Sequence, residues 1–311
     1  KGKWVIVVQK GAFRRAREVT VPEGGMMVPV GLTTLPGKTD AAKNDFIPKM
    51  AVIDGAWDDI ERSLAKLGLG QVDSKGGLVK DSESLYFYQC KLVTLFPPVQ
   101  DCKPAAPSKL LTDYTELSKY NILFVPCDSD WLDGYFTYNK VKENLTKWIK
   151  AGGRLYVTDY QYDLLHLILP KFIKWVGQSG TLGSAELTSS YDAAAMVQEP
   201  GLKAWLKVQG ITNFTLKDSY TVIDSVTKLP APGPDEKPHD VLPQAWILAN
   251  TPQNGIKPAT VSYPYGCGRI LFSTYHTEGS KSTGATLLPQ ERALLYIILE
   301  TAVCLKNPEV G

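Results

Sequence analysis

Two short segments of the chain combine residue types that take part in acid–base and nucleophilic chemistry, and each follows an apolar run. His276 and Glu278 stand two residues apart, and Thr158 and Asp159 are adjacent. Cys127 follows a third apolar run and adds a thiol. A histidine oriented by a carboxylate can act as a base toward a nearby hydroxyl or thiol, and a carboxylate can itself be a nucleophile. The alternatives are a structural histidine at a strand end and a small buried cysteine.

Further residues after the same runs could bind a ligand, namely Asp54, Asp128, Asp130, Trp131 and Tyr160. Grouped carboxylates suit a hard cation such as calcium or magnesium, and the weak candidate ligands are Asp128, Asp130 and Asp159, with His276 beside them. The alternative is that these aspartates hydrogen-bond to the backbone of their own turns. The aromatic residues could stack on sugar rings or contact a partner protein. No Cys/His spacing typical of zinc occurs, and the sequence predicts no cofactor.

Short apolar runs alternate with amphipathic stretches and must position these residues. We expect strands at 50–53, 120–126 and 154–157, with helices at 57–67 and 137–151 between them, the second carrying Tyr138 on its packed face. Strand–helix–strand units of this kind imply right-handed crossovers and a parallel sheet. Ligands bind at the carboxyl ends of the strands of such sheets, so the candidate residues should meet at one edge.

The second half of the chain is predicted to be less regular before it ends in a hairpin and a helix. Residues 178–255 read as an irregular insertion, with a helix at 192–206 in two pieces and a strand at 220–226. Apolar runs at 259–263 and 269–273 flank a glycine-containing turn and predict a hairpin.

Residues 1–45 differ from the rest and predict an N-terminal β arm, or the tail of a preceding β domain, with a linker ahead of an α/β domain at 46–311. The strand expected at 3–8 would present unpaired backbone groups at its edge. Such an edge invites pairing with a neighbouring chain, so other protein subunits are the expected partners.

The hairpin run Gly266 to Glu278, which ends in His-Thr-Glu, resembles an element of class I glutamine amidotransferases, whose motif there is typically His-Pro-Glu. The run Gly152 to Asp159 is similar to the strand before the nucleophile elbow of that superfamily and of its trehalose-utilisation-protein-like relatives. The resemblance spans roughly residues 48–305. It implies an open, mostly parallel flavodoxin-like sheet flanked by helices, with His276 as base and Glu278 as the acid that orients it.

Two positions depart from the pattern of that superfamily. The bend after the 154–157 strand should carry a cysteine and carries Thr158-Asp159-Tyr160-Gln161 instead. The glycine-rich oxyanion loop would fall at Pro126 to Asp130, where aspartates would repel a developing negative charge. We therefore expect a non-catalytic amidotransferase-like binding or assembly module of an exported or cell-surface bacterial protein. The alternatives are a hydrolase that uses His276 with Asp159, Thr158 or Cys127, and a carbohydrate-binding domain.

Composition excludes some partners and bears on the compartment. The net charge is +2, with charges of both signs interspersed, so the sequence predicts no nucleic-acid partner. No apolar run reaches the length of a membrane span, which needs about 20 residues. Cys90 and Cys102 flank a proline-rich loop that a disulfide would brace, although two buried free thiols fit the sequence as well. A disulfide would agree with an extracellular, cell-surface or periplasmic location.

Overall fold

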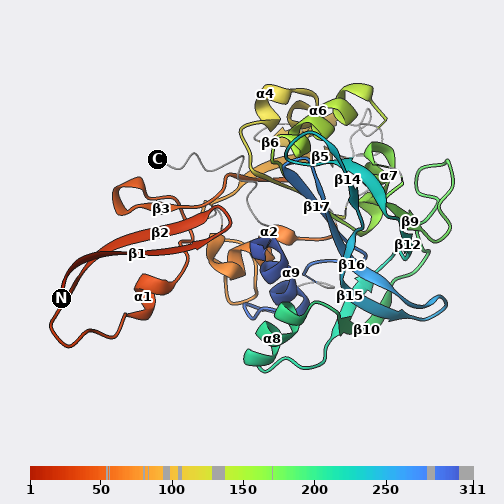
Figure 1. The fold of residues 1–311 in the computed structure, drawn as a ribbon. Helices are drawn as coiled ribbons and strands as arrows, with labels where there is room; N and C mark the ends of the chain where they lie inside the picture. The colour runs from red at the N-terminus through yellow and green to blue at the C-terminus, as the bar shows by residue number, and fades with distance from the viewer. Residues whose placement is uncertain are drawn as a thin grey trace.

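The computed structural model describes residues 1–53, 55, 57–79, 81–82, 84–93, 99–103, 107–127, 137–169, 171–278 and 284–300. A ten-stranded sheet forms the body of the molecule, with the strand order β11-β10-β15-β16-β17-β8-β7-β4-β5-β6 (Figure 1). Its strands are β4 (Met50–Ile53), β5 (Tyr86–Val93), β6 (Val99–Lys103), β7 (Ile122–Val125), β8 (Arg154–Thr158), β10 (Tyr191–Val197), β11 (Thr215–Ser219), β15 (Gln244–Thr251), β16 (Gly255–Tyr265) and β17 (Gly268–Ser273).

The centre of this sheet is parallel and both of its flanks are antiparallel. Parallel pairing joins β5 to β4, β4 to β7, β7 to β8 and β8 to β17. On one flank β6 pairs antiparallel with β5, and on the other β16 follows β17 as the predicted hairpin. The predicted fold class, an open α/β sheet with a parallel centre and a C-terminal hairpin, is confirmed.

Helices cover both faces of the sheet. They are α2 (Ile60–Leu64), α3 (Pro107–Thr112), α4 (Tyr114–Leu117), α6 (Asn139–Lys150), α7 (Tyr162–Ile168), α8 (Pro200–Val208) and α9 (Pro289–Glu300). In Figure 1, α6 and α7 lie on one side of the central strands, and α2 and α9 lie on the other. None of the described helices has the length and apolar character that a membrane span requires.

The alternation of side chains along each central strand explains why these strands are apolar at every position. Leu123 and Val125 of β7 belong to the core that α6 covers, whereas Ile122 and Phe124 belong to the core that α9 covers. A strand buried on both faces needs an apolar residue at each position, and parallel strands are typically of this kind. The uninterrupted apolar runs in the sequence were therefore a sound signal for the parallel centre of the sheet.

The N-terminal arm is a separate three-stranded sheet of β1 (Gly2–Lys10), β2 (Phe13–Val21) and β3 (Asp45–Phe46), and Figure 1 shows its hairpin projecting from the body. Asp45 holds β3 against β2, because its carboxylate accepts hydrogen bonds from Arg15 Nε at 2.9 Å and Arg17 Nη2 at 2.7 Å. These bonds lower the pKa of Asp45 to about 2. Toward the open end of the hairpin, near the N-terminus, Trp4 and Val5 are 61% and 63% exposed.

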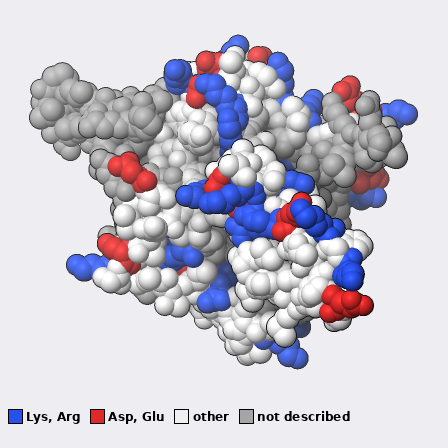
Figure 2. All heavy atoms as spheres, turned by 90° about the vertical axis from the view of Figure 1, so that its left-hand side faces the viewer, with Lys and Arg blue, Asp and Glu red and all other residues white. Residues whose placement is uncertain are grey.

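Short elements complete the chain. They are α1 (Val30–Thr33), the 3₁₀ turns at Ala41–Lys43 and Asp159–Gln161, the π-helical turn at Ala65–Leu69, and two small sheets that pair β9 (Ile173–Trp175) with β12 (Ile223–Val226) and β13 (Leu229–Pro232) with β14 (Pro238–Val241). Figure 2 looks onto the side of the molecule from which the arm projects, and Lys and Arg side chains gather near its centre with acidic ones beside them. That face therefore carries charge of both signs.

Several predicted elements differ from the structure. Residues 191–197 form strand β10 rather than a helix, because pairing with β11 and β15 outweighs the helical propensity of an alanine-rich stretch. The segment 178–255, expected to be irregular, contributes β10, β11 and β15 to the main sheet. The second predicted helix begins at Asn139, and Tyr138 is the residue before it, 54% exposed and not on the packed face.

Candidate functional site

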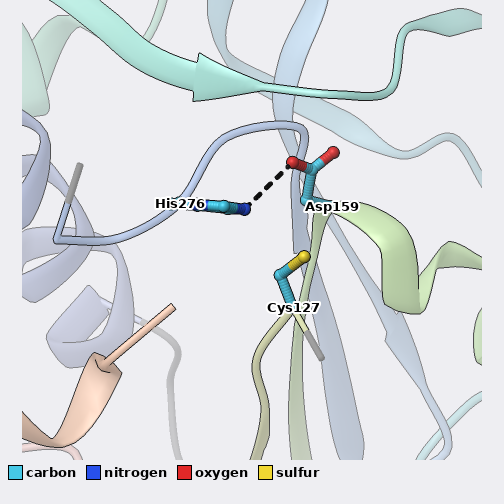
Figure 3. A group of neighbouring side chains, drawn as sticks. All are labelled: Cys127, Asp159 and His276. Atoms are coloured by element: carbon cyan, nitrogen blue, oxygen red, sulfur yellow. Dashed lines mark ion pairs between the residues drawn. The ribbon is translucent and has the colours of Figure 1, made fainter. Parts of the chain in front are cut away.

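The ends of β8 and β17 meet at one edge of the sheet, as the sequence predicted. The two strands are parallel neighbours with Thr158 opposite Ser273, so the residues that follow them emerge side by side. His276 Nε2 lies 3.4 Å from Asp159 Oδ2 (Figure 3). The bend after β8 and the segment after the hairpin therefore form one site.

Asp159 occupies the sharp turn between β8 and α7. Its backbone has a φ of 46°, a left-handed conformation that is uncommon for a residue with a side chain. A strand that turns into a helix through such a residue is the backbone arrangement of a nucleophile elbow. The bend after β8, where the resemblance implied a cysteine, therefore has the backbone form of such an elbow, with Asp159 as its left-handed residue.

The carboxylate of Asp159 is fully buried and is already held by hydrogen bonds. It accepts the backbone N–H of Tyr220 at 3.0 Å and the hydroxyl of Thr221 at 2.9 Å. Burial raises the pKa of Asp159 well above its usual value, because the charged form loses its hydration.

Thr158 precedes this turn, and its side chain is also committed to internal contacts. Its hydroxyl donates to Asp58 Oδ2 at 2.9 Å and accepts the backbone N–H of Cys127 at 2.8 Å. The residue has no exposed surface. Thr158 thus joins the ends of β7 and β8, which is a structural role.

Asp58 is a central residue of the site that the sequence analysis missed, because position 58 falls inside the helix expected at 57–67. The helix begins later, at Ile60, and the buried Asp58 points to the edge of the sheet instead. Its carboxylate accepts the backbone N–H of Thr277 at 2.9 Å, in addition to the bond from Thr158. Burial raises the pKa of Asp58. No local pattern could reveal these partners, since all of them come from distant parts of the sequence.

His276 is buried, with 6% of its surface exposed, and its ring stacks on Tyr220 with 5.7 Å between ring centroids. Its backbone is fixed on both sides, since its N–H donates to Asp218 O at 3.1 Å and its carbonyl accepts Gln290 Nε2 at 2.7 Å. Its Nε2 atom has no hydrogen bond of good geometry to any residue that the structure describes.

Cys127, Asp159 and His276 form a compact cluster, drawn in Figure 3. One side-chain ligand atom from each residue lies within 4.8 Å of the other two. Cys127 follows β7, is buried and is not in a disulfide. The structure therefore unites three predicted candidates from the ends of three strands.

Glu278 takes a different position from the one that the family resemblance implied. Its buried carboxylate lies 3.5 Å from Arg62 Nη1, and no hydrogen bond or ion pair between Glu278 and His276 occurs among the described residues. Burial raises the pKa of Glu278 to about 7. The carboxylate that faces the imidazole belongs to Asp159, so the expected orienting role of Glu278 needs correction.

The remaining predicted ligand residues do not form part of the described cluster. The hydroxyl of Tyr160 donates to Leu187 O at 2.7 Å, and its ring packs edge-on against Tyr220, which commits both ends of the side chain to internal contacts. The ligand predictions for Asp54, Asp128, Asp130 and Trp131 lie outside the described residues.

The cysteines bear on the disulfide prediction. Strands β5 and β6 place Cys90 directly opposite Cys102 in an antiparallel pair. Cα atoms of such pairs lie about 4.5–5.5 Å apart, within the range that a disulfide spans. Cys267, whose redox state the sequence left open, is disulfide-bonded.

Comparisons with known proteins add structural likenesses at low sequence identity. No protein-family model and no curated protein matches the sequence. A cytoplasmic protein from Salmonella typhimurium matches with 11% identity and a TM-score of 0.44, over 97% of this chain and 96% of that one. A putative ThuA-like protein from Bacteroides uniformis matches with 12% identity and a TM-score of 0.42, over 81% of this chain and 91% of that one. The resemblance stated from the sequence was to relatives of this ThuA-like class.

A β-galactosidase from Bacillus circulans matches with 12% identity and a TM-score of 0.40, over 84% of this chain and 32% of that one. The chain thus spans about a third of the length of the β-galactosidase chains that it matches.

Proposed function

We propose that this chain is a non-catalytic, amidotransferase-like module that serves binding or assembly in an exported or cell-surface bacterial protein. The observation that carries the proposal is Asp159 at the elbow, where its buried carboxylate is occupied by donors from Tyr220 and Thr221. A nucleophile at an elbow has to face the substrate with its reactive atom available. Asp159 keeps the backbone turn and uses its side chain to hold the neighbouring chain segment.

Thr158, the other predicted nucleophile on this turn, is also poorly placed to react. The hydroxyl of Thr158 already donates to the carboxylate of Asp58, so it has no proton to give to His276. Glu278 contacts Arg62 and not the imidazole. The amidotransferase pattern is therefore kept at His276 alone, since the bend after β8 carries Asp159 in place of a cysteine and Glu278 contacts Arg62, which supports a non-catalytic role.

The experiment is a turnover assay on the purified full chain with glutamine and with simple esters. We expect no hydrolysis above the rate without protein, and the same result for His276→Ala. Hydrolysis that disappears in His276→Ala and persists in a control variant, His239→Ala, would refute the non-catalytic proposal. His239 suits this control because it is exposed and pairs with Asp235 away from the cluster.

The assembly part of the proposal rests on strand β1 of the N-terminal arm. β1 lies at the edge of its sheet in the part of the chain that the structure describes, and Trp4, Val5 and Val7 on it are exposed. An edge strand with free backbone groups and apolar side chains is the surface that strand addition uses. We propose that β1 pairs with the arm of a second copy of this chain.

Light scattering during size-exclusion chromatography tests this pairing. We expect the wild-type chain to form a dimer or larger assembly and Val5→Lys to shift it to the monomer. Ile256→Lys is the matched control, because Ile256 is also an exposed apolar residue on a strand, β16 of the main sheet. A monomeric wild-type chain, or equal effects of both variants, would remove the strand-pairing proposal.

The disulfide of Cys267 supports an exported location, since disulfides persist in oxidising compartments.

A hydrolase that uses Cys127 with His276 is the second candidate function. It is favoured by one observation, the closeness of the thiol to the imidazole within the 4.8 Å cluster. This candidate predicts that an electrophilic probe labels Cys127 in the native chain and that His276→Ala abolishes the labelling. Absence of labelling by a broad panel of thiol- and hydroxyl-directed probes would remove it.

A further inference from the structure

We propose that Cys127, Asp159 and His276 bind one divalent transition-metal ion of the zinc type. The three residues offer a thiolate sulfur, a carboxylate oxygen and an imidazole nitrogen, each of which zinc accepts as a ligand. They come from the ends of three adjacent parallel strands, β7, β8 and β17, which hold them on a rigid edge. The inference goes beyond the proposed function and does not depend on it.

The distance between the nitrogen and oxygen ligands of the cluster suits a tetrahedral site, and the sulfur of Cys127 lies within 4.8 Å of both. Zinc binds nitrogen and oxygen at about 2.0–2.2 Å, so two such ligands at the tetrahedral angle lie about 3.4 Å apart. The distance from His276 Nε2 to Asp159 Oδ2 is 3.4 Å. This distance is long for a hydrogen bond between a ring N–H and a carboxylate, but it is the separation expected of two ligands around one ion.

The orientation of His276 is an independent observation that points to a ligand. Its ring is buried and fixed by stacking on Tyr220, and Nε2 faces the cluster without a hydrogen bond of good geometry among the described residues. A buried nitrogen without such a partner destabilises the fold, because its desolvation is not compensated. A metal ion bound to the lone pair of Nε2 would provide the missing interaction.

The groups around the cluster already position its other ligands. The backbone N–H of Tyr220 and the hydroxyl of Thr221 donate to the carboxylate of Asp159, and Thr158 accepts the backbone N–H of Cys127. Hydrogen bonds to ligating carboxylates are typical of metal sites and set the direction of the ligand. When the thiol loses its proton on binding, one thiolate and one carboxylate balance the two charges of the ion. The three residues and the ion together then carry no net charge, which suits a buried site.

The thiol decides the class of metal. Calcium and magnesium prefer oxygen ligands, whereas a cysteine together with a histidine selects zinc, cobalt or similar ions. The hard cation considered from the sequence is therefore not the ion that this cluster suits. The three residues leave one position of a tetrahedron for water or another ligand.

The experiment uses the purified full chain, treated with a chelator and then titrated with Co²⁺ and Zn²⁺. We expect one equivalent of Co²⁺ to give an intense near-ultraviolet thiolate-to-cobalt band and the visible bands of a tetrahedral complex, both displaced by Zn²⁺. Elemental analysis should find one zinc per chain after gel filtration. Zn²⁺ should also raise the melting temperature, since a ligand that binds only the folded state stabilises it.

Variants separate this site from other metal-binding groups. Cys127→Ser should lose the thiolate band, and His276→Ala should weaken binding at least about 100-fold. Thr221→Ala keeps all three ligands and should weaken binding about 10-fold, because it removes a group that orients Asp159. His239→Ala is the control and should bind as the wild type does.

A wild-type chain that binds no Co²⁺ with a thiolate band would overturn the inference, whatever the folding of the variants. Retention of the band in Cys127→Ser would also overturn it. Turnover by the metal-loaded wild-type chain would refute the non-catalytic proposal while leaving the metal site intact, so the two failures are distinguishable.

Discussion

Replacement of Asp58 tests how strongly one buried carboxylate holds the candidate site together. Its two oxygens accept the hydroxyl of Thr158 at 2.9 Å, and the backbone N–H and hydroxyl of Thr277 at 2.9 and 3.2 Å. In Asp58→Ala these buried donors lose their acceptor, and each unsatisfied donor costs about 1–3 kcal/mol. The hydroxyls can turn to other acceptors, whereas the backbone N–H cannot. We therefore expect Asp58→Ala to lower the free energy of unfolding by about 4 kcal/mol.

Asp58→Asn should cost less, about 2 kcal/mol, because the amide oxygen can still accept from Thr277 while the hydroxyl of Thr158 accepts from the new amide nitrogen. The assay is urea unfolding of the wild-type and variant chains at pH 7, followed by fluorescence and circular dichroism. Asp240→Asn is the control, since Asp240 is exposed and pairs only with Lys228 among the described residues, and it should change stability by less than about 0.5 kcal/mol. The reasoning fails if Asp58→Ala and Asp240→Asn unfold at the same urea concentration.

Three further predictions concern the rest of the chain. Asp45 has a pKa lowered to about 2 by its two arginines, so its contribution to stability is present above pH 4 and is lost as the pH falls toward 2. The stability difference between wild type and Asp45→Asn, about 1 kcal/mol at pH 7 after solvent screening, should shrink over that range in acid unfolding curves. Gly153→Ala should lower the free energy of unfolding by at least about 1–3 kcal/mol, measured in thermal melts, because the added Cβ would lie 2.2 Å from the indole of Trp148 in α6. Gly31→Ala is the control, because a Cβ at that position meets no other atom. Non-reducing peptide mapping should recover Cys90 and Cys102 in one disulfide-linked fragment, and recovery of both as free thiols would contradict the pairing.

The parallel centre of the fold could be predicted because its signal is local. Strands buried on both faces leave uninterrupted apolar runs, and β7 and β8 are of this kind. Parallel neighbours end at the same edge, so the meeting of Asp159 and His276 followed from strand order alone. The failure at β10 has the opposite origin, since the Asp, Ala and Met residues between Tyr191 and Val197 have no strand-like pattern of their own and extend because β11 and β15 pair with them.

The contacts of the site could not be predicted because they depend on side-chain direction and on distant partners. The resemblance gave Glu278 as the carboxylate that orients His276, and only the side-chain directions decide that Asp159 faces the ring instead. The cluster with Cys127 escaped notice as a metal site because its three ligands lie on three strands and leave no characteristic spacing in the sequence.

The bonds of Asp58 also constrain the order in which the molecule can be completed. The partners of this carboxylate lie 100 and 219 residues further along the chain. During synthesis, the first strand–helix unit leaves the ribosome long before β17 and the segment that follows it exist. Until that segment arrives, Asp58 has to remain hydrated, and the edge of the sheet beside it has to stay open to water. A nascent chain stalled before β17 has been made should therefore expose this edge to proteases and chaperones, and the emergence of β17 and the segment that follows it should close it.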